Sequence, residues 1–418
     1  MKMIKSLIYL LLPFNILSSV LVFKFKKQEY SEEMEFIDYF ISSNLITTIK
    51  IGSPEQNIPT LISSNTSFLM IPGKELKGKF KEDISDSYKK RKNDEEYQSS
   101  ICYSKGFLSQ ETINFEDEKG KSIIQKNFPF YLPIKFNFNY PSTTIPNAYI
   151  GFSYKGRKDR ESLIRYLSEK SIINQQIFTL KFTKENEGEI IIGDFPHIYD
   201  NKYNEEYFIS SRIESSSLFP SWELKFNKIF FGKTNIIYLK ASLDFDLGVI
   251  YAPEYLQYYV LKEFFDDKLK DNSCQEIYNA FYNLTYYSCD KKVNIKQFPS
   301  LTFTYDEFGK TFTITYKDLW LEHDDKYYCL IVFPEVFYSW CLGTPFLKQA
   351  QFIFQVDRGE IGYYTKINAF SFPLFLIIVF IIIIIAMVYI LLFKKPYFMK
   401  KKKASELLET LDSNPLEK

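Results

Sequence analysis

Alternating apolar and polar residues recur between about residues 30 and 368. Runs of this kind are LITTIKI (45–51), SWELKFNKIFF (221–231), SLTFTY (300–305), TFTITY (311–316) and AQFIFQV (350–356). A period of two is typical of strands that bury one face, and turn residues separate these runs at short intervals. The pattern predicts a mainly β, largely antiparallel structure of the sandwich or barrel type. Helices are predicted at 159–170 and 253–270.

Two segments, 45–72 and 226–253, repeat the same order of features. Each has a β-run, a glycine or turn, a second apolar strand, a cluster of small or acidic residues and a proline. We interpret this order as a sign of two related lobes.

The longest apolar run lies near the C-terminus. Residues 374–393 (LFLIIVFIIIIIAMVYILLF) contain no charged side chain. Twenty helical residues at a rise of 1.5 Å each match the hydrocarbon core of a bilayer. The sequence predicts a transmembrane helix at 371–393. Six lysines follow the run, against Lys366 alone just before it, so the positive-inside rule predicts a cytosolic tail at 394–418 and a lumenal or extracellular remainder.

The N-terminus predicts a secretory signal peptide at 1–23. A short basic segment is followed by an apolar stretch from Ser6 to Phe23. We expect cleavage near Ser18 and Ser19; an uncleaved anchor is the alternative.

Composition narrows the classes of function. Among 418 residues, 52 Lys and Arg balance 51 Asp and Glu, giving a net charge of +1, which argues against a globally basic nucleic-acid binder. The chain has only two histidines, His197 and His323, which makes a multi-histidine metal site unfavourable. It has few glycines and neither a P-loop nor a dinucleotide fingerprint. We therefore expect no metal, no cofactor and no nucleic-acid partner.

An oxidising compartment would favour disulfides and glycans. The five cysteines are Cys102, Cys274, Cys289, Cys329 and Cys341, an odd number that leaves at least one without an intrachain partner. Two sequons, at Asn65 and Asn283, are glycosylation candidates.

Eight motifs, in order along the chain, resemble the pepsin-like aspartic peptidase family. They are IKIGSPEQ (49–56), NAYIGFSY (147–154), INQQIFTLKF (173–182), GEIIIG (188–193), SWEL (221–224), FPSLTF (298–303), LGTPFL (342–347) and FQVDRGEIG (354–362). The resemblance implies a bilobal fold with a deep cleft between an N-terminal lobe at 30–200 and a C-terminal lobe at 201–368. It also implies a peptide or protein ligand in that cleft and a disulfide between Cys289 and Cys329.

The chemistry of the family requires one carboxylate from each lobe. The two share a proton, because like charges at that distance do not both ionise. One acts as general base on a water molecule, and its protonated partner polarises the substrate carbonyl.

The sequence departs from the family at these positions. Ser63 aligns with the first catalytic Asp, and a serine hydroxyl is no proton acceptor near neutral pH. Asp244 aligns with the second Asp by its distance to Pro253, with Phe245 and Asp246 in place of the motif Thr and Gly. A rival register places Asp246 on the catalytic position but requires a two-residue deletion in the turn.

The family's substrate-covering flap is also altered. Tyr103 resembles the flap tyrosine, and the segment between it and Glu111 is shorter than in the family. A strand aromatic is the alternative role for Tyr103.

Three functions remain open. The preferred hypothesis is an inactive pseudo-peptidase that binds peptides or proteins. The second is a divergent, active aspartic endopeptidase that pairs Asp244 with Asp246, and the third is a non-catalytic surface receptor.

Overall fold

The computed structural model describes residues 20–32, 34–90, 95–98, 102–138, 148–154, 162–213, 221–367 and 379–389. The chain divides into two compact units, 1–201 with 205–365, and 202–204 with 366–418. Apart from residues 202–204 and 366–368, both expected lobes fall within the first unit.

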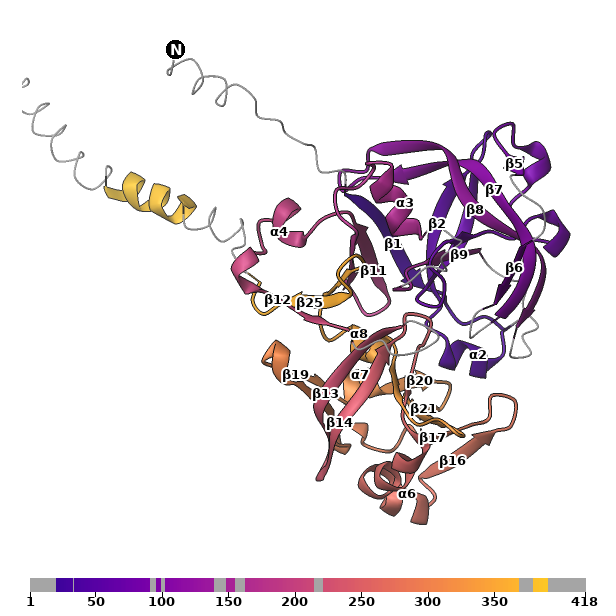
Figure 1. Cartoon of the computed structure of the whole chain (residues 1–418). Coiled ribbons are helices and arrows are strands. Elements are labelled where there is room, and N and C mark those ends of the chain that lie inside the picture. Colours follow the sequence, from indigo (N-terminus) through magenta and orange to yellow (C-terminus); the bar gives the residue numbers. More distant parts are fainter. Residues whose placement is uncertain are drawn as a thin grey trace, which may run out of the picture. The chain divides into compact units, whose positions relative to one another are not determined.

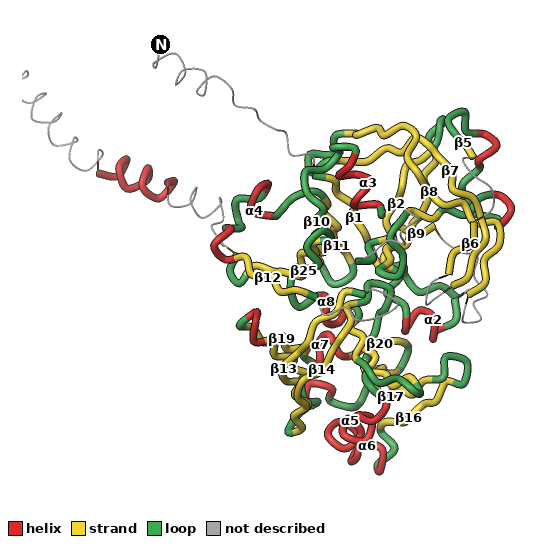
Figure 2. The backbone as a smooth tube through the Cα atoms, viewed as in Figure 1, coloured by secondary structure: helices red, strands yellow, loops and turns green. Residues whose placement is uncertain are grey.

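The described part of the first unit is mainly β, consistent with a bilobal pepsin-like fold (Figures 1 and 2). Its first sheet has fourteen strands, in the order β12 (Phe208–Arg212), β25 (Glu360–Tyr364), β24 (Phe352–Gln355), β10 (Ile177–Phe182), β11 (Glu187–Ile192), β1 (Leu21–Lys27), β2 (Leu45–Ile51), β3 (Gln56–Ser63), β9 (Ala148–Gly151), β4 (Leu69–Met70), β8 (Ser122–Phe138), β7 (Cys102–Glu116) and β5 (Lys89–Lys90), with β6 (Glu95–Gln98) beside β7.

The second sheet has eleven strands within the described residues. Their order is β19 (Lys310–Ile314), β18 (Leu301–Tyr305), β13 (Trp222–Phe231), β14 (Thr234–Leu243), β23 (Trp340–Leu342), β15 (Ile250–Tyr251), β22 (Ile331–Pro334), β17 (Leu284–Asp290), β21 (Lys326–Cys329) and β20 (Trp320–His323), with β16 (Cys274–Asn279) beside β17. The alternating runs of the sequence therefore became strands: β2 spans the whole of LITTIKI, and β13 nearly the whole of its run.

Helices are short. The α-helices are α2 (Phe36–Ile41), α3 (Leu163–Glu169), α4 (Pro196–Tyr199), α5 (Gln257–Val260), α6 (Asp266–Lys270), α7 (Tyr316–Leu319) and α8 (Thr344–Leu347); the 3₁₀ turns are η1 (Lys74–Leu76), η2 (Glu82–Ile84), η3 (Glu205–Tyr207), η4 (Glu254–Leu256), η6 (Ile295–Gln297) and η7 (Asp306–Phe308), and η5 (Leu261–Phe265) is a π-helix. Of the two predicted helices, the first is α3, which starts at its cap Ser162. The second is a succession of η4, α5, η5 and α6.

The two halves of the first unit exchange secondary structure. Strands β12, β24 and β25 come from the C-terminal half but complete the first sheet through the pairing of β24 with β10. Conversely, Phe40 and Ile41 of α2 are buried against Val249, Leu284 and Val332 of the C-terminal half. The expected boundary at 200/201 is therefore crossed in both directions.

An aromatic cluster fills the space where the halves meet. Phe354 stacks on Phe178 at 4.7 Å between ring centroids and contacts the rings of Trp222 (4.9 Å) and Phe245 (5.2 Å). All four side chains are at most 1% exposed. Burial of such rings contributes about 1.5–3 kcal/mol each, so this cluster fixes the loop that carries Phe245.

Strand β1 overlaps the end of the expected signal peptide. It lies between β11 and β2, and Leu21 and Phe23 are buried in the core. A signal peptide that ended at residue 23 would remove Leu21, Val22 and Phe23 from this strand, whereas the expected cleavage near Ser18 and Ser19 would leave the strand whole. Residues 1–19 lie outside the described residues, so the cleavage stays a prediction.

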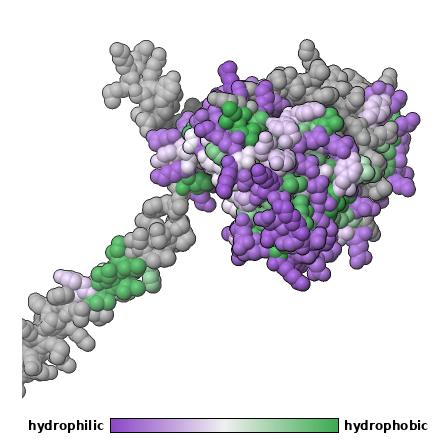
Figure 3. Space-filling view, turned by 90° about the horizontal axis from the view of Figure 1, so that it is seen from below, coloured by the Kyte–Doolittle hydropathy of each residue, from purple (hydrophilic) through white to green (hydrophobic). Residues whose placement is uncertain are grey.

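The described part of the second unit includes a helix at 379–389, whose residues are hydrophobic (Figure 3). No helix among the described residues reaches the length and hydropathy needed to cross a membrane. The expected transmembrane segment 371–393 extends beyond these residues at both ends, and the expected tail 394–418 lies outside them.

The expected disulfide between Cys289 and Cys329 is wrong. The structure joins Cys274 to Cys289, and Cys329 and Cys341 are free, buried thiols. The register explains the difference: Cys274 lies directly opposite Cys289 on β16 and β17, whereas β21 places Tyr327 opposite Cys289. Cys329 is two residues further along β21, out of reach of a direct cross-strand bond.

This pairing predicts that Cys274→Ser with Cys289→Ser lowers the free energy of unfolding by about 3 kcal/mol, the loop-entropy value for a 15-residue loop. Peptide mapping of the unreduced protein will recover a 274–289 cross-linked peptide, and the control Cys329→Ala will leave that peptide intact. A cross-linked peptide that contains Cys289 and Cys329 would contradict the assignment.

Candidate active site

Two loops from different halves of the first unit meet face to face. Strand β3 ends at Ser63, and Asp244 directly follows β14. Each strand pairs in parallel with a short strand, β3 with β9 and β14 with β23. The backbone around Ser63 and the backbone around Asp244 are therefore built in the same way.

Hydrogen bonds inside each loop repeat this equivalence. The amide of Asn65 donates to Ser63 Oγ at 3.1 Å, and the amide of Asp246 donates to Asp244 Oδ1 at 2.8 Å. Ser63 and Asp244 thus each accept a bond from the residue two positions later. The geometry favours the register that aligns Asp244, and not Asp246, with Ser63.

The side chain of Asp246 crosses from its own loop to the other. Its Oδ2 accepts hydrogen bonds from Ser63 Oγ (3.1 Å), the Ser64 amide (2.9 Å), Ser64 Oγ (3.1 Å) and Asn65 Nδ2 (2.8 Å). A glycine, which the family has here, would supply none of these bonds.

Ser64 makes the return contact. Its hydroxyl donates to Asp244 Oδ1 at 2.8 Å and accepts from the Phe245 amide at 3.1 Å. Phe245 offers no hydroxyl in exchange, because its ring is turned into the aromatic core. The bracing between the loops is consequently made by Ser64 and Asp246.

A third segment, which sequence reasoning missed, supports the Asp246 loop. The Ser43 amide donates to the Asp246 carbonyl at 2.8 Å, and the Ser43 hydroxyl bonds to the Phe245 carbonyl. The Gly248 amide donates to the Ile41 carbonyl at 2.6 Å, and a Cβ on Gly248 would lie 2.7 Å from the Ser42 carbonyl oxygen. No sequence motif marks Ser43, because its role arises only from the return of residues 41–43 to the second sheet.

Burial and charge make Asp246 an unusual carboxyl group. Burial, together with the charge of Asp244, raises the pKa of Asp246 to about 8, although hydrogen bonds from the Ser64 amide and the Ser63 hydroxyl lower it. Asp246 therefore holds a proton at acidic and neutral pH.

Cys341 contacts the same site. Its Sγ lies 3.8 Å from Asp244 Oδ2, and burial, with the nearby Asp244 charge, raises the pKa of the thiol well above its ordinary value. The thiol is thus neutral, and it makes a poor nucleophile.

Ser63 is the covered member of the two loops. It is 0% exposed, whereas Ser64, Asn65, Asp244 and Asp246 are each partly exposed. The group at the position of the family's first carboxylate is therefore shielded from solvent.

Tyr103 lies on a hairpin formed by β6 and β7. Gln98 of β6 pairs antiparallel with Tyr103 of β7, so the chain reverses direction on the N-terminal side of Tyr103. The segment between Tyr103 and Glu111, expected to be a shortened part of the flap, is continuous strand within β7. Residues 99–101 themselves lie outside the described residues.

Neither histidine belongs to this site. His197 lies in α4, where its Nδ1 is 2.6 Å from the Tyr364 hydroxyl. His323 ends β20 and stacks on Phe36 at 4.4 Å between ring centroids. Among the described residues, no cluster of three or more His, Cys, Asp or Glu side chains is arranged to hold a metal ion.

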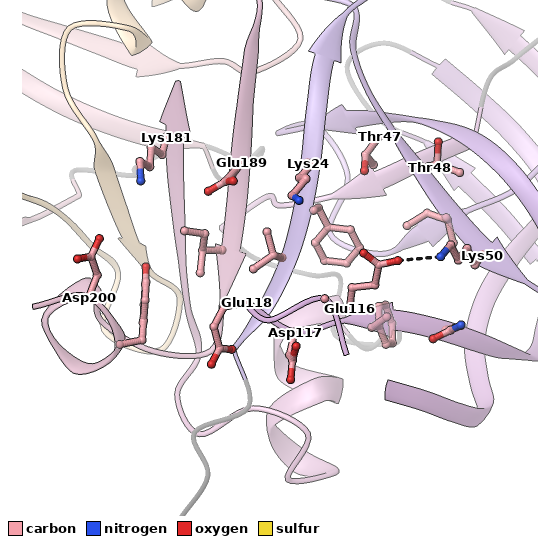
Figure 4. A pocket seen from close by; sticks show the side chains of 18 residues that line it. Lys24, Thr47, Thr48, Lys50, Glu116, Asp117, Glu118, Lys181, Glu189 and Asp200 are labelled. Carbon is pink, nitrogen blue, oxygen red and sulfur yellow. Dashed lines mark hydrogen bonds and ion pairs between the residues drawn. The ribbon is translucent and has the colours of Figure 1, made fainter. Parts of the chain in front are cut away.

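A hollow of about 560 Å³ lies elsewhere, beside β1, β2, β7 and β11 (Figure 4). Its walls mix both charge signs, and Lys50 pairs there with Glu116 at 2.7 Å. It shares no residue with the Ser63 and Asp244 loops.

Comparison with known proteins gives two findings. Residues 44–365 match the family model described as eukaryotic aspartyl protease. The chain is also similar to the acid protease of Saccharomycopsis fibuligera, with 24% identity over 343 residues that cover 76% of this chain and 79% of the relative.

The protonated Asp246 predicts a pH dependence of stability. The pKa rises from 3.8 for a free carboxyl to about 8 in the fold, so between these values the unfolded chain loses a proton that the folded chain keeps. This contribution to the free energy of unfolding is greatest below pH 4, decreases as pH rises and levels off above pH 8. Asp246→Asn, which cannot ionise, will remove it.

Denaturant titrations at several pH values check this: the difference between Asp246→Asn and the wild type will grow from pH 4 to pH 8 in favour of the variant. The control Asp290→Asn changes an exposed carboxylate in the same way and will show no such growth. Parallel profiles for Asp246→Asn and the wild type would contradict the assignment.

Proposed function

The chain belongs to the eukaryotic aspartyl protease family, and we propose that it is a pseudo-peptidase, a membrane-anchored member that binds peptide or protein segments without cleaving them. The observation that carries this proposal is the fully buried hydroxyl of Ser63, which donates to Asp246 at the position of the family's first carboxylate.

The catalytic cycle of the family needs a proton acceptor in each half of the site. The Ser63 hydroxyl does not accept a proton near neutral pH, and it is already engaged with Asp246 and the Asn65 amide. Asp244 therefore faces no carboxylate on the first-lobe loop. A water molecule beside Asp244 lacks the second group that would polarise a peptide carbonyl.

Binding a peptide does not require the two carboxylates that cleaving it requires. The two sheets, the aromatic cluster and the contact between the loops maintain the relation of the two halves. An extended peptide is bound mainly through main-chain hydrogen bonds and side-chain pockets, neither of which needs a catalytic dyad. We place the ligand in the cleft that the family resemblance implies between the lobes.

One observation favours a second function, a divergent aspartic endopeptidase. Asp244 and Asp246 are close enough for the charge of one to raise the pKa of the other, so the pair holds one proton between two carboxyls. In this alternative Asp244 is the general base and Asp246 the acid, both from one loop. Within the residues that the structure describes, no contact favours the third hypothesis, a surface receptor.

Anchoring is part of the proposal. The apolar run 374–393 and the six lysines after it support a type I orientation, with 20–367 in the lumen or outside the cell and 394–418 in the cytosol.

Assays of the full-length chain purified in detergent test the proposal. With unfolded protein as substrate at pH 3–6, the wild type will cleave no faster than Asp244→Asn, whereas both will bind labelled peptides with similar affinity. Ser63→Asp combined with Asp246→Gly restores one carboxylate in each half and returns the glycine, so this variant is expected to gain cleavage at acid pH.

Wild-type cleavage that disappears in both Asp244→Asn and Asp246→Asn would overturn the proposal and support the one-loop pair. Phe281→Ala, an exposed position in another loop, serves as the control and will match the wild type in both assays.

A further inference from the structure

The chain has two candidate glycosylation sequons, at Asn65 and Asn283, and their surroundings in the structure differ. The geometry points to Asn283, and not Asn65, as the site of an N-linked glycan, whose first sugar packs on the ring of Phe281. This inference rests on the lumenal orientation in the proposed function but not on the presence or absence of catalysis.

The side chain of Asn65 is already hydrogen-bonded within the fold. Its Nδ2, the atom to which a glycan would be attached, donates to Asp246 Oδ2 at 2.8 Å. The residues around it are buried: Ser63, Thr66 and Ser67 are at most 5% exposed. A sugar on Asn65 would break this bond and separate the two loops.

Asn283 has the opposite surroundings. It is exposed and ends the turn between β16 and β17 with a positive φ of 51°. Its Oδ1 accepts a hydrogen bond from the Tyr278 hydroxyl at 2.5 Å, and its carbonyl accepts from the Glu335 amide at 2.9 Å. These bonds fix the residue while, among the described residues, Nδ2 has no partner.

The turn also presents an aromatic ring at a short distance along the chain. Phe281 lies two residues before Asn283 and is 48% exposed. Asn279 Oδ1 holds the turn by accepting from the amides of Phe281 and Tyr282 at 3.1 and 2.9 Å. The C–H groups on the apolar face of a sugar pack well on an exposed aromatic ring, so this arrangement would order the first sugar of the glycan.

A glycan on Asn283 explains the exposed apolar side chains around this sequon. Tyr278 (52% exposed) and Val336 (70%) lie within one residue of groups that hydrogen-bond to Asn283. With Phe281 they form an exposed apolar surface around the sequon, at the end of the hairpin that projects from the second sheet (Figure 1). Such surfaces promote association unless they are covered.

The experiment expresses the full-length chain in a eukaryotic secretory cell in two forms. One form keeps the native N-terminus, and the other replaces residues 1–19 with an established cleavable signal peptide. Site-specific mass spectrometry after enzymatic glycan removal measures occupancy at both sequons, and protease protection of intact vesicles reports the orientation. We expect Asn283 to be occupied and Asn65 bare in both forms, with Asn283→Gln abolishing the glycan-dependent mass shift.

A bare Asn283 in the chain with the exogenous signal, or a glycan on Asn65 in folded protein, would overturn the inference. If Asn283 is modified only in the chain with the exogenous signal peptide, the proposed orientation is refuted, whereas the assignment of Asn283 as the glycan site is retained.

A thermal-unfolding cycle tests the contact with Phe281. Enzymatic removal of the glycan will lower the Tm of the wild type, and this loss will be absent in Phe281→Ala. Ile124→Ala removes another exposed apolar side chain (62% exposed), from β8, and will retain the full loss. An equal loss of Tm in Phe281→Ala and the wild type would refute the stacking.

Discussion

The contact between Asp246 and the Ser63–Asn65 loop determines what the site of this protein does. One carboxylate oxygen accepts four hydrogen bonds from a loop some 180 residues away in the chain. The same bonds cover Ser63, whereas burial and the charge of Asp244 raise the pKa of Asp246 and keep its proton in place at neutral pH. The contact between the two loops and the chemistry of the site therefore share one side chain, which a family member with glycine at this position would not have.

Much of the fold could be predicted from the sequence, because strands that bury one face leave a clear alternation. The errors arose where the outcome depends on pairing between distant strands. The disulfide partner of Cys289 is decided by the register of β16 against β17 and of β21 against β17, which the spacing of cysteines does not encode. For the same reason the segment after Tyr103 was interpreted as part of a shortened flap, whereas it is continuous strand within β7.

The candidate site, like the fold, could be predicted from the sequence only in part. The positions of Ser63 and Asp244 follow from motif spacing, since each comes at the end of a strand that the pattern identifies. The direction of the Asp246 side chain, the support from Ser43 and the proximity of Cys341 do not follow from it. Each depends on a segment that approaches from elsewhere in the fold. In the sequence alone, aspartate in place of the family's glycine indicated a damaged catalytic loop, and nothing in the motif indicated the contact that this aspartate makes.

The place of β1 in the first sheet has a consequence for how the protein is made. Leu21 pairs with Ile192, so β1 finds its principal neighbour only after most of the N-terminal half has been synthesised. Such non-local pairings slow folding and leave strand edges open in the meantime. The newly made chain thus passes through a long interval in which β1 has only its short pairing with β2, at Lys26 and Lys27, and the rest of this apolar strand lacks a partner.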